Sequence, residues 1–147
     1  MSTDTLPPRM KKYTVIILIV ICFLALTACG NKKEIVLPEV ENITEVEIIE
    51  NTSEIFKIIS DKEEISKLIS DIKDNSENDN TESVNDQPTN VDSYIIIKFY
   101  HKDEGKNPSV AYLYKEKGNC YIEQPYTGIW KLKQGIFNNI SDLISKK

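Results

Sequence analysis

The densest run of strand-forming residues in the chain is YIIIKFYHKDEGKNPSVAYLYKEKGNCYIEQPYTGIWKL, residues 94–132. Four stretches within it, 94–100, 110–115, 120–124 and 129–132, are rich in β-branched and aromatic residues. Short polar turns, each with a glycine, separate them. Such short connections predict antiparallel pairing, because a parallel pair needs a crossover of a dozen residues or more. The segment therefore predicts a four-stranded antiparallel sheet.

Two further strands and two helices are predicted around this sheet. Residues 40–50 and 54–60 alternate or concentrate apolar side chains on either side of an Asn-Thr-Ser turn, which predicts a β-hairpin. Residues 61–74 and 134–145 repeat apolar side chains with a helical period. The sequence thus predicts an α+β fold, with an antiparallel sheet of about six strands in the order strand–strand–helix–strand–strand–strand–strand–helix. Both amphipathic helices are expected to pack on one face of the sheet.

Two segments of the chain are predicted to lie outside this packing. Residues 75–93 consist almost entirely of Asn, Asp, Ser, Glu and Thr, so we expect a polar surface loop. Residues 29–39 show no periodicity and end near a proline, which is typical of a tether. Fully extended, residues 30–38 could span about 30 Å. The predicted domain therefore covers residues 40–147.

The N-terminus has the features of an export signal. Lys11 and Lys12 precede an apolar run, residues 13–26, that falls short of the roughly 20 residues of a membrane-spanning helix. The run ends in Leu-Thr-Ala-Cys at residues 26–29, which resembles the lipobox of bacterial lipoproteins. That resemblance implies a diacylglyceryl group on Cys29 and removal of residues 1–28 as a signal peptide. An uncleaved signal anchor is the alternative, and both Met1 and Met10 remain candidate starts.

Location and charge follow from this interpretation. Loss of one Asp, one Arg and two Lys with the signal peptide changes the formal charge from -5 to -7. An acidic domain is not attracted to anionic lipid, so we expect it to stand off the extracytoplasmic face of the cell membrane on its tether. The same acidity argues against a nucleic-acid partner. Lysine occurs 17 times and isoleucine 22 times, a composition that points to a low-GC Gram-positive bacterium.

The domain also resembles a family of unknown function. The quoted lipobox, Val-Glu-Asn-Ile at residues 40–43, Ser-Asp-Lys-Glu-Glu-Ile at 60–65, Ser-Val-Asn-Asp at 83–86 and Tyr-Ile-Glu-Gln-Pro-Tyr-Thr-Gly-Ile at 121–129 are similar to a domain-of-unknown-function family of small Gram-positive lipoproteins. The likeness covers about residues 33–143. It implies a shared fold and a lipid-anchored location, and it implies no activity.

One set of residues suggests a binding surface. Side chains at alternate positions of a strand share a face, so five tyrosines of the predicted sheet should lie together. They are Tyr94, Tyr100, Tyr112, Tyr114 and Tyr121. Tyrosine combines a large apolar ring with a polar tip, which suits a protein or glycan partner of the cell envelope. Ordinary cross-strand aromatic pairing is the other explanation.

Catalytic chemistry has less support in the sequence. Glu123 could pair with Glu45 or Glu47 as acid and base, which leaves a small envelope hydrolase as an alternative function. Cys120 has no neighbouring base and is expected to be an inert buried thiol, and His101 is expected in a solvated turn. No residue is assigned a catalytic or metal-binding role, and no cofactor is expected. The predicted function is a non-enzymatic, lipid-anchored binding module, with an immunity or inhibitor lipoprotein as a further alternative.

Overall fold

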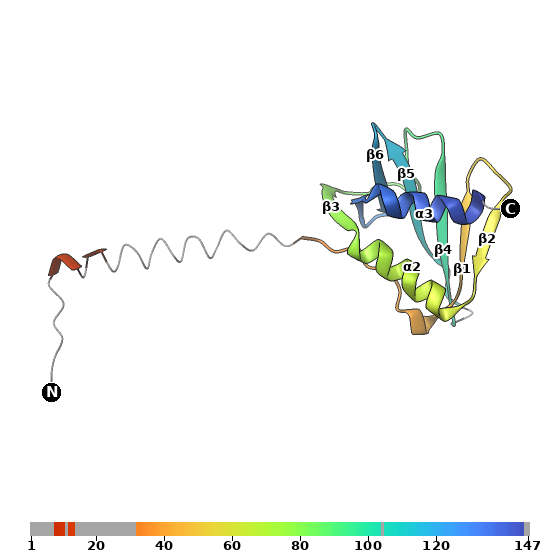
Figure 1. The fold of residues 1–147 in the computed structure, drawn as a ribbon, viewed down its shortest axis with the longest axis horizontal. Helices are drawn as coiled ribbons and strands as arrows, with labels where there is room; N and C mark the ends of the chain where they lie inside the picture. Colours follow the sequence, from red (N-terminus) through yellow and green to blue (C-terminus); the bar gives the residue numbers. More distant parts are fainter. Residues whose placement is uncertain (1–7, 11, 14–31, 104, 146–147) are drawn as a thin grey trace. The chain divides into compact units, whose positions relative to one another are not determined.

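The computed structural model of the protein describes residues 8–10, 12–13, 32–103 and 105–145 (Figure 1). The predicted lipobox and most of the predicted signal peptide lie outside these residues. Every strand and helix discussed below belongs to one compact unit, Lys33–Lys147. Within the described parts of the chain, no helix has both the length and the apolar character needed to cross a membrane.

A seven-stranded antiparallel sheet forms the frame of the domain. Its elements follow the chain as η1 (Val40–Asn42), β1 (Ile43–Glu50), β2 (Phe56–Ile59), α2 (Lys62–Asp74), β3 (Ser76–Thr81), β4 (Tyr94–His101), β5 (Ser109–Glu116), β6 (Asn119–Gln124), β7 (Gly128–Leu132) and α3 (Gln134–Ser145). The strand order across the sheet is β2-β1-β4-β5-β6-β7-β3. The predicted α+β class is confirmed, with one strand more than expected.

Both helices lie on the same face of the sheet (Figure 1). The predicted apolar stripe of α2 is buried, and α3 contributes Ile140 and Ile144 to the same core. From the sheet, alternate residues such as Val46, Ile97 and Leu113 enter this core with no exposed surface. In the described part of the chain, no helix lies on the opposite face of the sheet, which is called the open face below (Figure 1).

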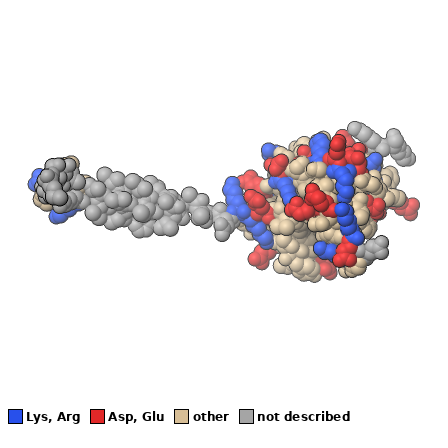
Figure 2. Space-filling model, turned by 90° about the horizontal axis from the view of Figure 1, so that it is seen from below, with Lys and Arg blue, Asp and Glu red and all other residues tan. Residues whose placement is uncertain are grey.

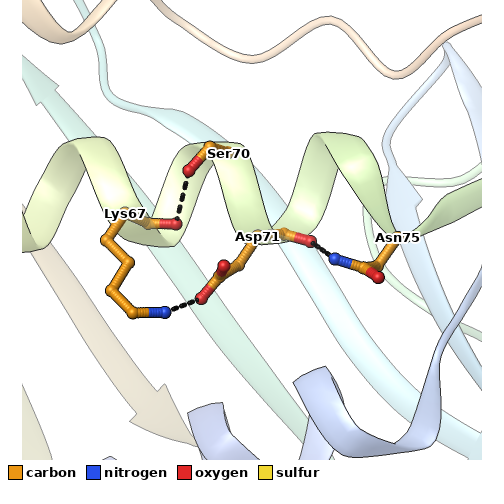
Figure 3. A network of polar contacts seen from close by, with 4 residues as sticks. All are labelled: Lys67, Ser70, Asp71 and Asn75. Carbon is orange, nitrogen blue, oxygen red and sulfur yellow. Dashed lines mark hydrogen bonds and ion pairs between the residues drawn. The ribbon is translucent and has the colours of Figure 1, made fainter.

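Local contacts fix the two ends of α2. The Asp61 carboxylate accepts hydrogen bonds from the backbone N–H groups of Glu63 and Glu64, each at 3.0 Å, and so caps the first turn. At the other end, Asn75 Nδ2 donates to the carbonyl oxygen of Asp71 at 2.7 Å (Figure 3). The chain therefore leaves the helix at residue 75 and turns directly into β3.

The polar segment predicted as a loop over about 75–93 is only partly a loop. Residues 76–81, SENDNT, form β3 and pair with β7, with Ser76 opposite Leu132 and Asn78 opposite Trp130. Backbone hydrogen bonds form a strand whatever its side chains, and a strand at the edge of a sheet can be polar. Composition alone therefore misjudged residues 76–81, while residues 82–93 do connect the strands β3 and β4.

The predicted tether is also part of the fold from Lys33 onward. Ile35 and Leu37 are 5% and 3% exposed and belong to the core. Trp130 Nε1 donates to the Lys33 carbonyl oxygen at 2.8 Å, and Gln124 Nε2 donates to the Val36 carbonyl oxygen at 2.8 Å. The domain therefore begins at residue 33 and not at residue 40. The signal missed was the run of three apolar residues at 35–37, which a free tether does not need.

Candidate functional site

The open face brings together all five tyrosines singled out in the sequence. The strand register sets Tyr94 opposite Tyr114 and Tyr114 opposite Tyr121. The Tyr114 and Tyr121 rings stack with their centroids 5.6 Å apart, and Tyr94 meets Tyr112 edge to face at 5.5 Å. Four of the five rings are thus already paired with one another, which is how cross-strand aromatic residues stabilise a sheet.

The loop of residues 82–93 crosses part of the open face and is hydrogen-bonded to it. Ser83 Oγ donates to the Glu123 carboxylate at 2.6 Å, and both residues are 5% exposed. Further along, Tyr126 OH donates to Asp86 Oδ1 at 2.8 Å. These contacts tie the loop to β6 and to the turn that follows it. The two motifs at 83–86 and 121–129 therefore meet in the folded domain.

Because the loop covers part of the open face, not all of the tyrosines are accessible to a partner. Tyr114 is only 7% exposed, so a partner cannot reach its ring. Burial, followed by the nearby Glu123 carboxylate, raises the pKa of the Tyr114 hydroxyl. Tyr94 OH donates to Gln87 of the loop at 3.3 Å, which ties this ring to the loop as well. Besides Tyr94, three tyrosines of the predicted face, Tyr100, Tyr112 and Tyr121, are half-exposed, and the Tyr112 ring packs against Tyr94.

Tyr100 belongs to a polar cluster on β1 and β4. Its hydroxyl donates to Glu47 Oε2 at 2.9 Å, and Lys98 Nζ lies 3.3 Å from the same oxygen. The hydrogen bond to Glu47 is the main reason why the pKa of Tyr100 is raised, and burial adds to it. The ion pair with Lys98 and the hydrogen bond from Tyr100 give Glu47 a structural role on this face.

An apolar row runs from the edge of the sheet toward the tyrosines. Register pairs Phe56 of β2 with Ile49, Ile49 with Ile96, and Ile96 with Tyr112. Phe56 is 58% exposed, and its neighbour on the same face, Ile58, is 45% exposed. Phe56, Ile58, Ile49 and Ile96 together are called the β2 patch. It lies at the sheet edge, where β2 has β1 as its neighbour in the described structure.

The sequence also contains a signal for the β2 patch. Four of the five residues 55–59 are apolar, although only alternate side chains of a strand can face the core. Ile59 does so, at 4% exposure, whereas Phe56 and Ile58 point to the other face. A strand that is apolar on both faces at the edge of a sheet marks a surface that other proteins can contact.

The predicted acid–base pair does not form. Glu45 and Glu47 lie on β1 and Glu123 lies on β6, and β4 and β5 separate these strands. Three strand spacings correspond to about 14 Å. Paired carboxylates in glycosidases are about 5–9.5 Å apart. The prediction that Glu123 could pair with Glu45 or Glu47 is therefore wrong, because β4 and β5 lie between the two strands that carry these residues.

The other nucleophile and base candidates have ordinary structural roles. Cys120 is a free, buried thiol, and burial raises its pKa, which keeps it protonated. His101 is not in a solvated turn: it is half-buried at the end of β4, and its Nε2 lies 2.8 Å from Ser109 Oγ. In the described part of the chain, no carboxylate is hydrogen-bonded to this ring, and no group of three His, Cys, Asp or Glu residues could hold a metal ion.

The helix side of the domain carries a second concave surface. A groove of about 440 Å³ lies between α2, α3 and β2, with Leu68 and Ile140 among its lining residues. Its rim is charged, since Lys67 and Asp71 of α2 form an ion pair at 2.5 Å beside it (Figure 3). Cationic and anionic side chains are also intermixed over the face drawn in Figure 2. This mixed charge does not favour a polyanionic ligand.

Comparison with known proteins matches the domain to a family and to a solved fold. The family model DUF5301, described as "Domain of unknown function (DUF5300)", matches residues 31–131. An NMR structure of a protein from Ruminococcus gnavus is 28% identical, and the match covers 71% of this chain and 99% of that one, with a TM-score of 0.58. No curated protein matches the chain. The α+β architecture is thus shared with a solved structure.

Proposed function

The chain belongs to the DUF5301 family, and we propose that it is a Gram-positive lipoprotein whose domain binds an extended segment of an envelope protein along strand β2. The proposal has two parts, an anchor and a binding surface. They rest on different observations and are tested separately.

The anchor is proposed at Cys29. Support comes from the basic residues and the short apolar run before it, and from the Leu-Thr-Ala-Cys motif that resembles a lipobox. One acyl chain binds a membrane only marginally, whereas two chains hold a protein stably, and a diacylglyceryl group has two. The proposed location is the extracytoplasmic face of the cell membrane. Mass spectrometry of the native protein tests this part, and an unmodified thiol with an intact leader contradicts it.

The binding surface is proposed at the β2 patch. The observation that supports it is the exposure of Phe56 and Ile58 on an edge strand, continuous with the half-buried Ile49 and Ile96. An added strand would gain backbone hydrogen bonds from β2 and would cover these side chains, as in other cases of strand addition. The patch is short and apolar, so an extended peptide with alternate apolar side chains fits it best.

A protein partner fits this surface better than a glycan. Sugars stack on exposed aromatic faces, but Tyr114 is buried and Tyr94 and Tyr112 are paired with each other. A non-enzymatic role also fits the distance between Glu47 and Glu123 across the sheet. The half-exposed Tyr100 and Tyr121 remain available to extend the contact with a bound segment.

Site-specific photo-crosslinking in the native host tests the binding surface. A photoreactive amino acid replaces Phe56 in one strain and Leu143, which is 38% exposed on α3, in a control strain. We expect one envelope protein to be crosslinked from position 56 and not from position 143. In the otherwise native protein, Ile58→Ser should weaken this crosslink while leaving the thermal midpoint nearly unchanged, because Ile58 is 45% exposed.

Two outcomes would contradict the binding proposal. Equal crosslinking from positions 56 and 143 would mean that the β2 patch has no specific partner. Crosslinks only to a second copy of the chain would make β2 a self-association edge instead. Analytical ultracentrifugation of the purified Ile58→Ser variant and of the unsubstituted protein identifies this second outcome, because the substitution lowers the sedimenting mass only if the chain self-associates through β2.

A further inference from the structure

Three exposed apolar side chains lie on segments that are hydrogen-bonded to one another near the point where the chain enters the domain. Val36 is 72% exposed, and Val84 and Tyr126 are each 67% exposed. They come from three different segments: the entering chain, the loop of residues 82–93, and the turn between β6 and β7. Together these three residues are called the entry rim.

Hydrogen bonds hold the three segments together. Gln124 Nε2 donates to the Val36 carbonyl oxygen at 2.8 Å, which ties the entering chain to the end of β6. The bond from Tyr126 OH to Asp86, at 2.8 Å, ties the loop to the turn two residues further on. Val84 lies between Asp86 and Ser83, which is itself bound to β6. Hydrogen bonds therefore tie the three segments that carry the entry rim to the end of β6 and the turn that follows it.

The backbone of Tyr126 is held in an unfavourable conformation. Its φ is +56°, in the left-handed region that glycine and asparagine adopt more readily than tyrosine. A glycine is available only two positions later, at Gly128. The turn therefore keeps a large amphipathic ring exposed at a position where a smaller residue would fit with less strain. Strain of this kind is a reason to look for a function of the side chain.

The chain between the proposed anchor and the domain is short. Lys33 is fixed to the domain because its carbonyl oxygen accepts from Trp130 Nε1 at 2.8 Å and its Nζ donates to the Thr127 carbonyl oxygen. Only residues 30–32 separate Lys33 from Cys29. Four residue steps span at most about 14 Å, even when fully extended. The turn that contains Tyr126 must then stay within a short reach of a lipid attached to Cys29.

We propose that the entry rim rests on the lipid headgroups of the membrane, with the Tyr126 ring and the two valines in the interfacial layer. This inference rests on the proposed lipidation of Cys29. The headgroup layer is about 5–7 Å deep on each side of the hydrocarbon, so an anchor of this length keeps the rim at its surface. Tyrosine is one of the residues enriched at that depth, because its ring is apolar and its hydroxyl is polar.

Charge near the entry rim indicates which contact dominates. Lys32 and Lys33 precede it, while Glu34, Glu82 and Asp86 lie within two residues of its members. These charges nearly cancel, so attraction to anionic lipid is small. The contact should therefore depend on the apolar side chains and change little with salt or with the fraction of anionic lipid.

This orientation leaves the β2 patch away from the membrane. Lys33 is bonded to β7 and its preceding turn, and β2 is the opposite edge of the sheet from β7 and β3. Five strand spacings, about 24 Å, separate β7 from β2. A domain that rests on the entry rim thus presents β2 to partners in the envelope. A long flexible tether, as expected from the sequence, would instead leave the orientation of the domain free.

Depth-dependent fluorescence quenching tests the entry rim in the full lipidated protein. The protein is purified from its membrane and reconstituted into phosphatidylcholine vesicles with a minor fraction of phosphatidylglycerol. Single cysteines at Val84→Cys, Tyr126→Cys and Phe56→Cys are labelled with an environment-sensitive dye, while Cys120 is buried and Cys29 is occupied by lipid. Lipids with a nitroxide near the headgroup serve as quenchers.

We expect several-fold stronger quenching of the dye at positions 84 and 126 than at position 56. Val84→Cys leaves the bond between Tyr126 and Asp86 intact, so it reports on the rim even if the substitution at Tyr126 disturbs the turn. Equally weak quenching at all three positions, on vesicles that carry the floated, lipidated protein, overturns the rim proposal and leaves the anchor standing. Protein that neither floats with the vesicles nor carries lipid on Cys29 overturns both.

Discussion

Removing one core side chain from the entering segment should destabilise the domain far more than removing its exposed neighbour. Ile35 and Leu37 are 5% and 3% exposed, whereas Val36 between them is 72% exposed. The proposed changes are Ile35→Ala, Leu37→Ala and, as a matched control, Val36→Ala. If residues 33–38 were a free tether, all three changes would be neutral.

The expected loss follows from the buried carbon atoms. Ile→Ala and Leu→Ala each remove three carbons, worth about 2.4 kcal/mol at about 0.8 kcal/mol for each buried CH₂. The cavity left in the core raises the cost to about 3 kcal/mol, within the range measured for such changes. With a urea dependence of about 1.5 kcal/mol/M, this shifts the unfolding midpoint down by about 2 M. Val36→Ala should change the free energy of unfolding by less than about 0.5 kcal/mol.

Fluorescence of Trp130 provides the assay. It is the single tryptophan of the chain, it is 1% exposed, and its indole N–H is bonded to Lys33, so its emission reports directly on this segment. Urea unfolding of residues 30–147 gives the midpoint and slope for each variant. Midpoints for Ile35→Ala and Leu37→Ala that coincide with that of Val36→Ala would refute the packing of the entering segment.

Three further outcomes are expected. Ser83→Ala removes a hydroxyl donor from the buried Glu123 carboxylate and should cost about 2 kcal/mol in urea unfolding; an unchanged midpoint would mean that the loop is not held there. The raised pKa of Tyr114 means that stability is retained below pH 10 and falls above it, so Tyr114→Phe should decline less steeply with alkaline pH than the unsubstituted protein. Asp61→Ala should cost about 1 kcal/mol through loss of the helix cap, whereas Ser60→Ala should be nearly neutral; the reverse order would move the cap to Ser60.

Sequence patterns predicted the helices and the central strands because both depend on local periodicity. The apolar stripe of α2 was readable from Ile65 to Ile72, and α3 spans the predicted residues 134–145. Alternation places Ile97 and Leu113 on the face opposite the five tyrosines, and both are buried. These residues face the core in every register that buries the apolar face, so no knowledge of distant contacts was needed.

Two segments were misassigned because their structure depends on distant residues. Residues 76–81 become a strand since β7 offers them an unpaired edge, and nothing in SENDNT requires a strand. Residues 33–38 are ordered by Trp130 and Gln124, which lie about 90 residues further along the chain. Composition describes how a segment interacts with water, but it does not tell which partner the rest of the chain provides.

For the candidate sites, the sequence alone determined which residue types share a face, and the tertiary structure decided which of them are accessible. The five tyrosines follow from strand alternation, yet only folding brings the loop of residues 82–93 over Tyr114 and leaves Phe56 and Ile58 open at the edge. Likewise, the sequence contains Cys29 and Lys33, but only the structure shows that the domain begins at Lys33, which sets the length of the linker after Cys29. Periodicity is a property of neighbours along the chain, whereas exposure is set by which segments the sheet brings together.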